Sequence, residues 1–273
     1  MLKFFKTWTL PISMLAGAIG YFVFANVTFL EPTKPFMYTL IAYLTPFLIF
    51  AQLLLTFCKI SVRELMPSPW HGWHGWLLLI QAVSSLVLAA LLLWLPMREE
   101  YRDVFEGAMV CLICPTATAA AVITGKLGGS ASSLTTYTLL SNLLAAIVVP
   151  LVFPLVEPHA EITFFAAFLK ILGKVFPLLL FPFFLALFLR RFIPPIHRFL
   201  AGLRDMAFYL WAVALAIVTG QTVKSLVNSE AEIYVEILIA LGGLITCIAQ
   251  FYWGKRIGTK YNDRISPGQA LGQ

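Results

Sequence analysis

The stretch "CPTATAAAVITGKLGG" (residues 114–129) lies in an apolar part of the chain, yet it contains a proline, threonines, a lysine and glycines. Lipid-facing segments are rich in Leu, Ile, Val and Phe instead. Pro115 has no N–H group, so it disrupts the hydrogen-bond ladder of a helix. The stretch therefore predicts a helix that is broken within a membrane.

The rest of the chain has the composition of a membrane protein. Of its 273 residues, 60% are hydrophobic and 12% are charged, whereas a soluble domain has about 25% charged residues. A spanning helix needs about 20 mostly apolar residues. Eight windows meet this requirement, and we expect them to form an all-α integral membrane protein: 7–26, 36–57, 74–96, 104–124, 133–156, 164–189, 206–226 and 231–253.

Positive charges alternate along the chain. One set of alternating segments holds Lys3, Lys6, Lys59, Arg63, Lys126, Arg190, Arg191, Arg198, Arg204, Lys255, Arg256, Lys260 and Arg264, and the opposite set holds only Lys34, Arg98, Arg102 and Lys224. Positive loops stay in the cytoplasm, so we expect a cytoplasmic N-terminus in a multi-pass protein of the bacterial inner (cell) membrane. The net charge of +6 belongs to these loops and indicates no nucleic-acid partner.

Residues 104–124 predict two half-helices separated at Pro115. Freed backbone groups persist at bilayer depth only when they are buried in protein or line a wet cavity. A broken helix also offers a positive N-terminal end to an anion and free carbonyls to a cation. We therefore expect Pro115, Thr116 and Thr118 to form a transport site. The alternative is a kinked helix whose Ala and Thr residues allow close helix packing.

Further amides and hydroxyls occur in two other windows. Thr138 and Asn142 are four residues apart and share one helical face, which Thr135 extends. Gln81 is a lone amide in "WLLLIQAVSSL". Such side chains either line a transport pathway or form hydrogen bonds between helices, and both interpretations remain open.

No pattern typical of an enzyme is present. The chain has no Walker-type glycine-rich loop, and its Cys111-x-x-Cys114 motif lacks a partner pair for zinc. In "WHGWHGW" (70–76), alternating Trp and His predict an interfacial aromatic belt, with a metal or haem site at His71 and His74 as the alternative. In "LRRFIPPIHRFLAGLR" (189–204), Pro194-Pro195 predict a cytoplasmic linker without a helix.

The two stretches 1–157 and 163–273 predict an inverted repeat. Pro11 lies near the start of the first window, and Pro177 lies in the sixth. If the first stretch has five spans, this odd number requires the second to have the opposite orientation, a recurrent plan of transporters. The second stretch holds only three full spans before the polar segment 258–273, where the repeat predicts another broken helix.

Residues 114–154 resemble the crossover region of the bile acid:sodium symporter family. The resemblance rests on Cys114-Pro115, Thr118-Ala119, the Gly128-Gly129 turn, and a Ser/Thr-rich helix from Ser132 to Pro150 and Pro154. Gln81 is similar to the glutamine of the family's third helix. Gln269 and Gln273, in "GQALGQ", are similar to the acid and the glutamine of its ninth helix.

The resemblance implies two inverted five-helix repeats, in which a panel domain rocks against a core domain. Broken helices four and nine would cross at the site, together with Gln81, Thr138 and Asn142. It also implies sodium-coupled uptake of a small organic anion, such as a bile acid or a carboxylate. Under this resemblance the chain ends within the ninth helix, so the C-terminal end of the fold is expected beyond Gln273.

Two departures from the family pattern affect sodium. Where the family places a Ser-Asn pair that binds sodium, this chain has Ala120 and Ala121, and the expected acid is Gln269. Because a hard cation prefers oxygen ligands, we expect at most one sodium site, near Gln81 and Gln273. Proton-coupled or facilitated transport is an alternative. A second hypothesis is a non-transporting membrane sensor or structural protein of the same fold. No other cofactor and no oligomeric state are predicted.

Overall fold

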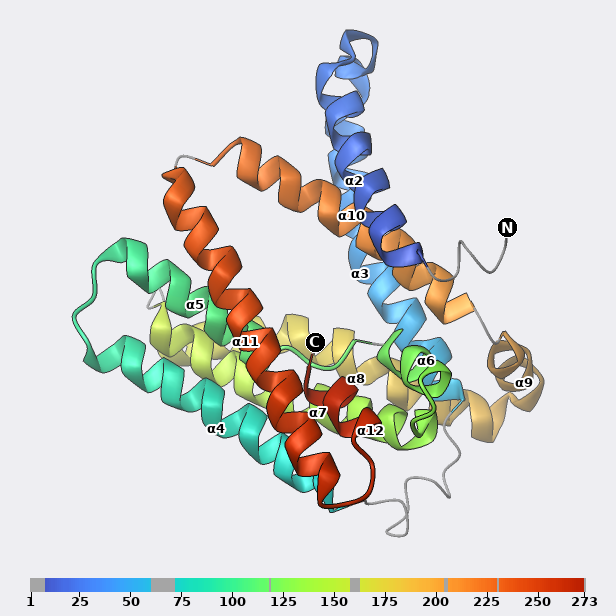
Figure 1. Ribbon diagram of the computed structural model, residues 1–273. Helices are drawn as coiled ribbons and strands as arrows, with labels where there is room; N and C mark the ends of the chain where they lie inside the picture. Colours follow the sequence, from blue (N-terminus) through green and yellow to red (C-terminus); the bar gives the residue numbers. More distant parts are fainter. Residues whose placement is uncertain are drawn as a thin grey trace.

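A computed structural model describes residues 8–59, 72–117, 119–157, 163–203, 206–229 and 231–272 (Figure 1). Every element in these ranges is helical. The long helices are α2 (Thr9–Asn26), α3 (Lys34–Cys58), α4 (Trp73–Trp94), α5 (Glu99–Ile113), α7 (Ala131–Val156), α8 (Phe164–Phe192), α10 (Met206–Val227) and α11 (Ile233–Thr259). The short ones are η1 (Thr28–Thr33), α6 (Ala119–Lys126), α9 (Pro194–Gly202) and α12 (Ile265–Leu271).

The predicted spans agree with these helices. Within the described residues, 7 helices are long and apolar enough to cross a membrane, and each corresponds to one of the predicted windows. The remaining window, 104–124, consists of two helices, α5 and α6. The predicted all-α membrane architecture and the predicted interruption of this span are therefore confirmed.

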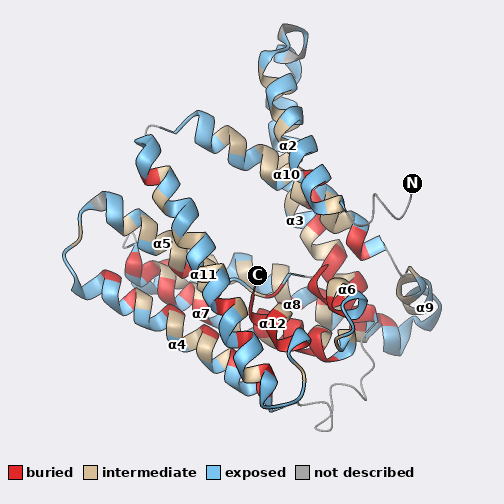
Figure 2. Ribbon diagram, viewed as in Figure 1, coloured by how far each residue is buried: buried red, intermediate tan, exposed pale blue. Residues whose placement is uncertain are grey.

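The helices pack into two groups. The first group comprises α2, α3 and α10, in which α10 packs against both α2 and α3. The second comprises α4, α5, α6, α7, α11 and α12, while α8 packs against both α3 and α7 and so joins the groups. Buried residues gather where α4, α6, α7 and α12 meet (Figure 2). The inverted relation of residues 1–157 and 163–273 stays a prediction.

Small residues allow the closest helix approaches. In the second group, Gly254 and Gly258 lie one turn apart on α11, and a Cβ at either position would overlap with backbone of Asp263 or Pro267. This spacing lets the chain turn back after α11 and place α12 against it. The polar C-terminal segment is thus packed into the second group rather than held apart from it.

The prediction for Pro194 and Pro195 was wrong. These residues end α8 but also begin a further helix, α9, with proline in its first turn. Proline is compatible with this position because the first N–H groups of a helix have no intrahelical partner and the fixed φ angle suits a helix.

The contact between α2 and α10 gives a stability test. A Cβ at Gly17 would overlap with the carbonyl oxygen of Ala216, whereas a Cβ at Gly20 would meet nothing within 4 Å. Gly17→Ala should destabilise the purified protein by about 1–3 kcal/mol through overpacking. Gly20→Ala should stabilise it by up to about 1 kcal/mol through helix propensity. Melting temperatures in detergent measure both variants, and equal shifts would contradict the packing.

Candidate functional site

The break in the fourth span follows from Pro115. The last helical residue of α5 is Ile113, and Cys114 adopts an extended conformation with φ −55° and ψ 136°. A residue before proline is disfavoured in the α region, because the proline ring clashes with its backbone. The chain resumes as a helix at Ala119. Residues 114–117 therefore form an open, non-helical segment between α5 and α6.

Gln81 of α4 binds the end of α5. Its buried side-chain Nε2 donates to the carbonyl oxygens of Ile113, at 3.2 Å, and Cys114, at 2.9 Å. Its Oε1 accepts hydrogen bonds from Tyr137 Oη at 3.3 Å and from Ser141 Oγ at 3.4 Å. Both amide donors and both oxygen lone pairs thus have partners. A single side chain therefore satisfies two of the backbone carbonyls that the break leaves without a helical partner.

Thr116 connects the break to two other helices. Its backbone N–H donates to Ser141 Oγ of α7 at 3.1 Å. Its hydroxyl donates to the carbonyl oxygen of Ala270 in α12 at 2.8 Å. The two residues of this second bond are 154 positions apart in the chain. The break in the fourth span and the C-terminal helix α12 therefore meet directly.

A second contact positions α12 at its other end. Ser266 Oγ accepts from the backbone N–H of Ser130 at 2.9 Å. The turn before Ser130 contains Gly128 with φ +87°, a left-handed conformation that glycine adopts without steric cost. Ser130 then caps α7 by accepting from the N–H of Ser133. The turn after α6 thus sets both the start of α7 and the place of α12.

The structure brings together only some of the predicted site residues. Pro115, Thr116 and Gln81 lie at the break, and Gln269, next to Ala270 in α12, is half-buried. Thr138 donates to the carbonyl of Leu134 in its own helix, and the buried Nδ2 of Asn142 has no hydrogen-bond partner. Thr118 and Gln273 lie outside the described residues.

Tyr137 and Ser141 are the polar residues of α7 that contact Gln81, and the prediction did not choose them. They are four residues apart, as Thr138 and Asn142 are, but begin one position earlier. One position turns a helix by about 100°, so the two pairs occupy different faces. The spacing that indicated a polar face on α7 is real, but both pairs have it, and only packing selects the face toward α4.

The positions matched to the family's Ser-Asn pair are buried and apolar. Ala120 and Ala121 belong to a cluster with Trp73, Leu77, Leu134, Tyr137, Ala270 and Leu271. Their methyl groups pack α6 against α4, α7 and α12, and they offer no side-chain oxygen. Among the described residues, no group of three or more His, Cys, Asp or Glu could hold a metal ion.

The aromatic-belt prediction for residues 70–76 is partly wrong. Trp73 and His74 are fully buried, while Trp76 is exposed. The His74 ring stacks on Trp73 with centroids 3.9 Å apart, and its Nε2 lies 3.0 Å from the carbonyl oxygen of Ser133. The N-terminal end of α4 therefore packs into the core, where both rings contact residues of α7, His74 at Ser133 and Trp73 at Tyr137. His71 lies outside the described residues.

A broken span that contacts the C-terminal helix α12 is the geometry that the resemblance to the bile acid:sodium symporter family implies. A comparison with family profiles tests whether the chain belongs to that family. The profile of the Sodium Bile acid symporter family matches residues 3–229. The chain belongs to this family. Members of the sodium bile acid symporter family are transporters, so the protein is a multi-pass membrane transport protein rather than an enzyme. The matched range includes the whole break but ends before α11 and α12. A comparison with curated proteins returned no match.

Replacing Gln81 tests how the break is stabilised. Gln81→Leu would leave the carbonyls of Ile113 and Cys114 buried without partners, and each unsatisfied group costs about 1–3 kcal/mol. We expect a loss of at least about 2 kcal/mol in thermal unfolding of the purified protein. Gln221→Leu is the matched control. Its amide is exposed and makes one contact of 3.5 Å, so its effect should stay within about 0.5 kcal/mol. Equal losses would contradict the role of Gln81.

Proposed function

We propose that this member of the sodium bile acid symporter family carries a small organic anion across the membrane by alternating access, with the break at residues 114–117 at its binding site. The observation that supports this most is the open segment at Pro115. Gln81 donates a hydrogen bond to the carbonyl of Cys114 in this segment. Thr116 donates hydrogen bonds to Ser141 and to Ala270 of α12. Irregular backbone of this kind within a span is typical of a site where cargo binds.

The charge distribution at the break favours an anion. Helix α6 begins there, and the first N–H groups of a helix carry partial positive charge and bind anions. The opposite pole, the C-terminal carbonyls of α5, would attract a cation. The last of these carbonyls, that of Ile113, and the next carbonyl, that of Cys114, already accept hydrogen bonds from Gln81. The positive end of α6 thus faces the break while the negative end of α5 is partly neutralised.

The two helix groups provide the moving parts in this proposal. The first group corresponds to the predicted panel domain and the second to the core domain, which contains the break. Among the described residues, and apart from those of α8, the main direct contacts between the groups are those of α6 with α10 and of α3 with α7. In one of them, Lys126 Nζ lies 5.0 Å from the centroid of the Phe208 ring. A surface with so few contacts permits one group to rotate against the other.

We propose that transport does not require sodium. Sodium would be cargo here, and it needs several oxygen ligands. Ala120 and Ala121 supply none, and the Gln81 oxygen already accepts from Tyr137 and Ser141. Gln269 offers a neutral amide in place of a carboxylate. This shortage of side-chain oxygen atoms for sodium therefore supports facilitated or proton-coupled transport of the organic anion. We also propose that the protein lies in the bacterial inner membrane with its N-terminus in the cytoplasm.

Uptake into vesicles tests the proposal. The purified chain is reconstituted, and uptake of labelled taurocholate and of labelled small carboxylates is measured in sodium and in potassium buffer. We expect uptake of at least one anion in both buffers. Uptake in sodium alone would overturn the coupling proposal but leave transport standing. Ligand-induced thermal stabilisation without uptake would instead support the non-transporting sensor.

Pro115→Leu tests the role of the break. Leucine restores an N–H group and removes the ring clash, so α5 and α6 can join into one helix. We expect uptake to be lost while membrane insertion is unchanged. Pro46→Leu is the matched control, because Pro46 is an exposed proline inside the continuous helix α3. Uptake by Pro115→Leu at the rate of the unmodified protein would contradict the proposed site.

A further inference from the structure

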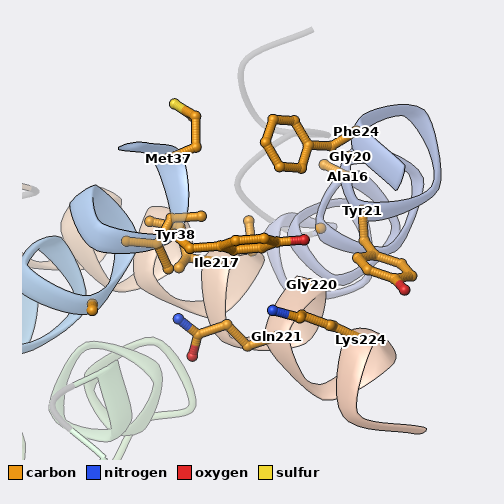
Figure 3. Close-up of a pocket in the computed structure, with 14 residues that line it drawn as sticks. Ala16, Gly20, Tyr21, Phe24, Met37, Tyr38, Ile217, Gly220, Gln221 and Lys224 are labelled. Atoms are coloured by element: carbon orange, nitrogen blue, oxygen red, sulfur yellow. The ribbon is translucent and has the colours of Figure 1, made fainter. Parts of the chain in front are cut away.

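A cavity lies away from the break, between α2, α3 and α10 (Figure 3). Its volume is about 500 Å³, within the range of ligand sites, roughly 300–1,000 Å³. The described residues that line it all belong to the first helix group, and none of them is among residues 114–117. A molecule bound here would therefore not touch the proposed transport site.

The cavity has an apolar body and one positively charged end. Phe24, Met37, Ile41 and Ile217 are among its apolar walls. The polar residues in its lining are Tyr21, Tyr38, Gln221 and Lys224, and Figure 3 shows the last two side by side. On α10 the lining runs from Ala216 to Lys224, a distance of about 12 Å at 1.5 Å per residue.

Among the ion pairs of the described residues, none joins Lys224 to an acid. Its Nζ lies 3.5 Å from the centroid of the Tyr38 ring, and no acidic residue is among the described residues that line the cavity. Lys34, the first residue of α3, does have an acidic partner. Its Nζ is 3.4 Å from Glu31 Oε1 and 3.2 Å from the carbonyl of Ala25. Lys224 is thus a half-buried cation at an apolar cavity, a favourable position for an anion.

We propose that this cavity binds an amphipathic monoanion, a molecule with one anionic head group and a long aliphatic body. The head group pairs with Lys224 near the end of α10, and Gln221 is placed to donate to it. The aliphatic body lies along α10 against the apolar walls. A free long-chain carboxylate and an anionic phospholipid share this chemistry, and the experiment separates the two sources.

Gly20 of α2 lines the cavity. A Cβ at this position would meet nothing within 4 Å, so a larger side chain enters the empty space without displacing backbone. Gly20→Leu should therefore fill part of the cavity and leave the helices in place. Gly173 of α8 is the matched control, because a Cβ there also meets nothing within 4 Å and the residue does not line the cavity.

Binding is measured in two arms, on the full chain and without any transport assay. In the first arm, the protein sits in phosphatidylcholine nanodiscs, and bound labelled oleate is counted. In the second, the nanodiscs contain phosphatidylglycerol and no free acid, and lipid retained by the protein is counted by native mass spectrometry. We expect saturable binding in at least one arm. Binding of oleate alone identifies a free amphiphile, and retention of phosphatidylglycerol alone identifies a lipid.

The variants give the decisive comparison. Lys224→Met should weaken binding about tenfold or more, because it removes a charge-assisted contact. Lys34→Met should leave binding unchanged. Gly20→Leu should reduce binding to a similar extent, and Gly173→Leu should not. The proposal is overturned if the unmodified protein binds neither probe, or if Lys224→Met and Gly20→Leu both bind as the unmodified protein does.

Discussion

The arrangement at the centre of this protein depends on the hydrogen bonds from Gln81 to the carbonyls of Ile113 and Cys114. A proline within a span releases carbonyls that lipid cannot satisfy. Here an amide from α4 satisfies two of them, and two hydroxyls of α7 fix that amide in turn. Without this side chain the break would be a buried defect. With it, the break is a stable structural element.

The same constraint explains the position of α12. The threonine after Pro115 has an N–H group that no helix uses, and it binds Ser141, while its hydroxyl binds Ala270. The backbone opening in one span thus provides the contacts that hold a segment from the far end of the chain. Gly254 and Gly258 permit this approach, because a Cβ at either position would overlap with backbone of α12 or of the turn before it.

The spans and the break could be predicted from the sequence. Several contacts at the candidate site could not, because they depend on how the helices pack. The spans follow from apolar length, and the break follows from Pro115, because both are local properties. The face of α7 that meets Gln81 does not, since the pairs Tyr137–Ser141 and Thr138–Asn142 have the same spacing. The burial of His74 and Trp73 depends on what packs over them, which composition does not reveal. The family match extends over the break and stops before α12, so the contact between them rests on the structure.

If residues 114–117 form a transport site, the break opens to water rather than serving as a lipid-facing kink. Cys114 tests this directly, because it lies in the break and is exposed, while Cys58 is buried in α3. The rate of modification by a charged, water-soluble methanethiosulfonate is compared with that by the membrane-permeant N-ethylmaleimide, in protein whose other cysteines are replaced by serine. Both reagents should modify Cys114, because an open transport site is accessible from water. Modification by N-ethylmaleimide alone would place the break against lipid, and a transport site at residues 114–117 would then be excluded.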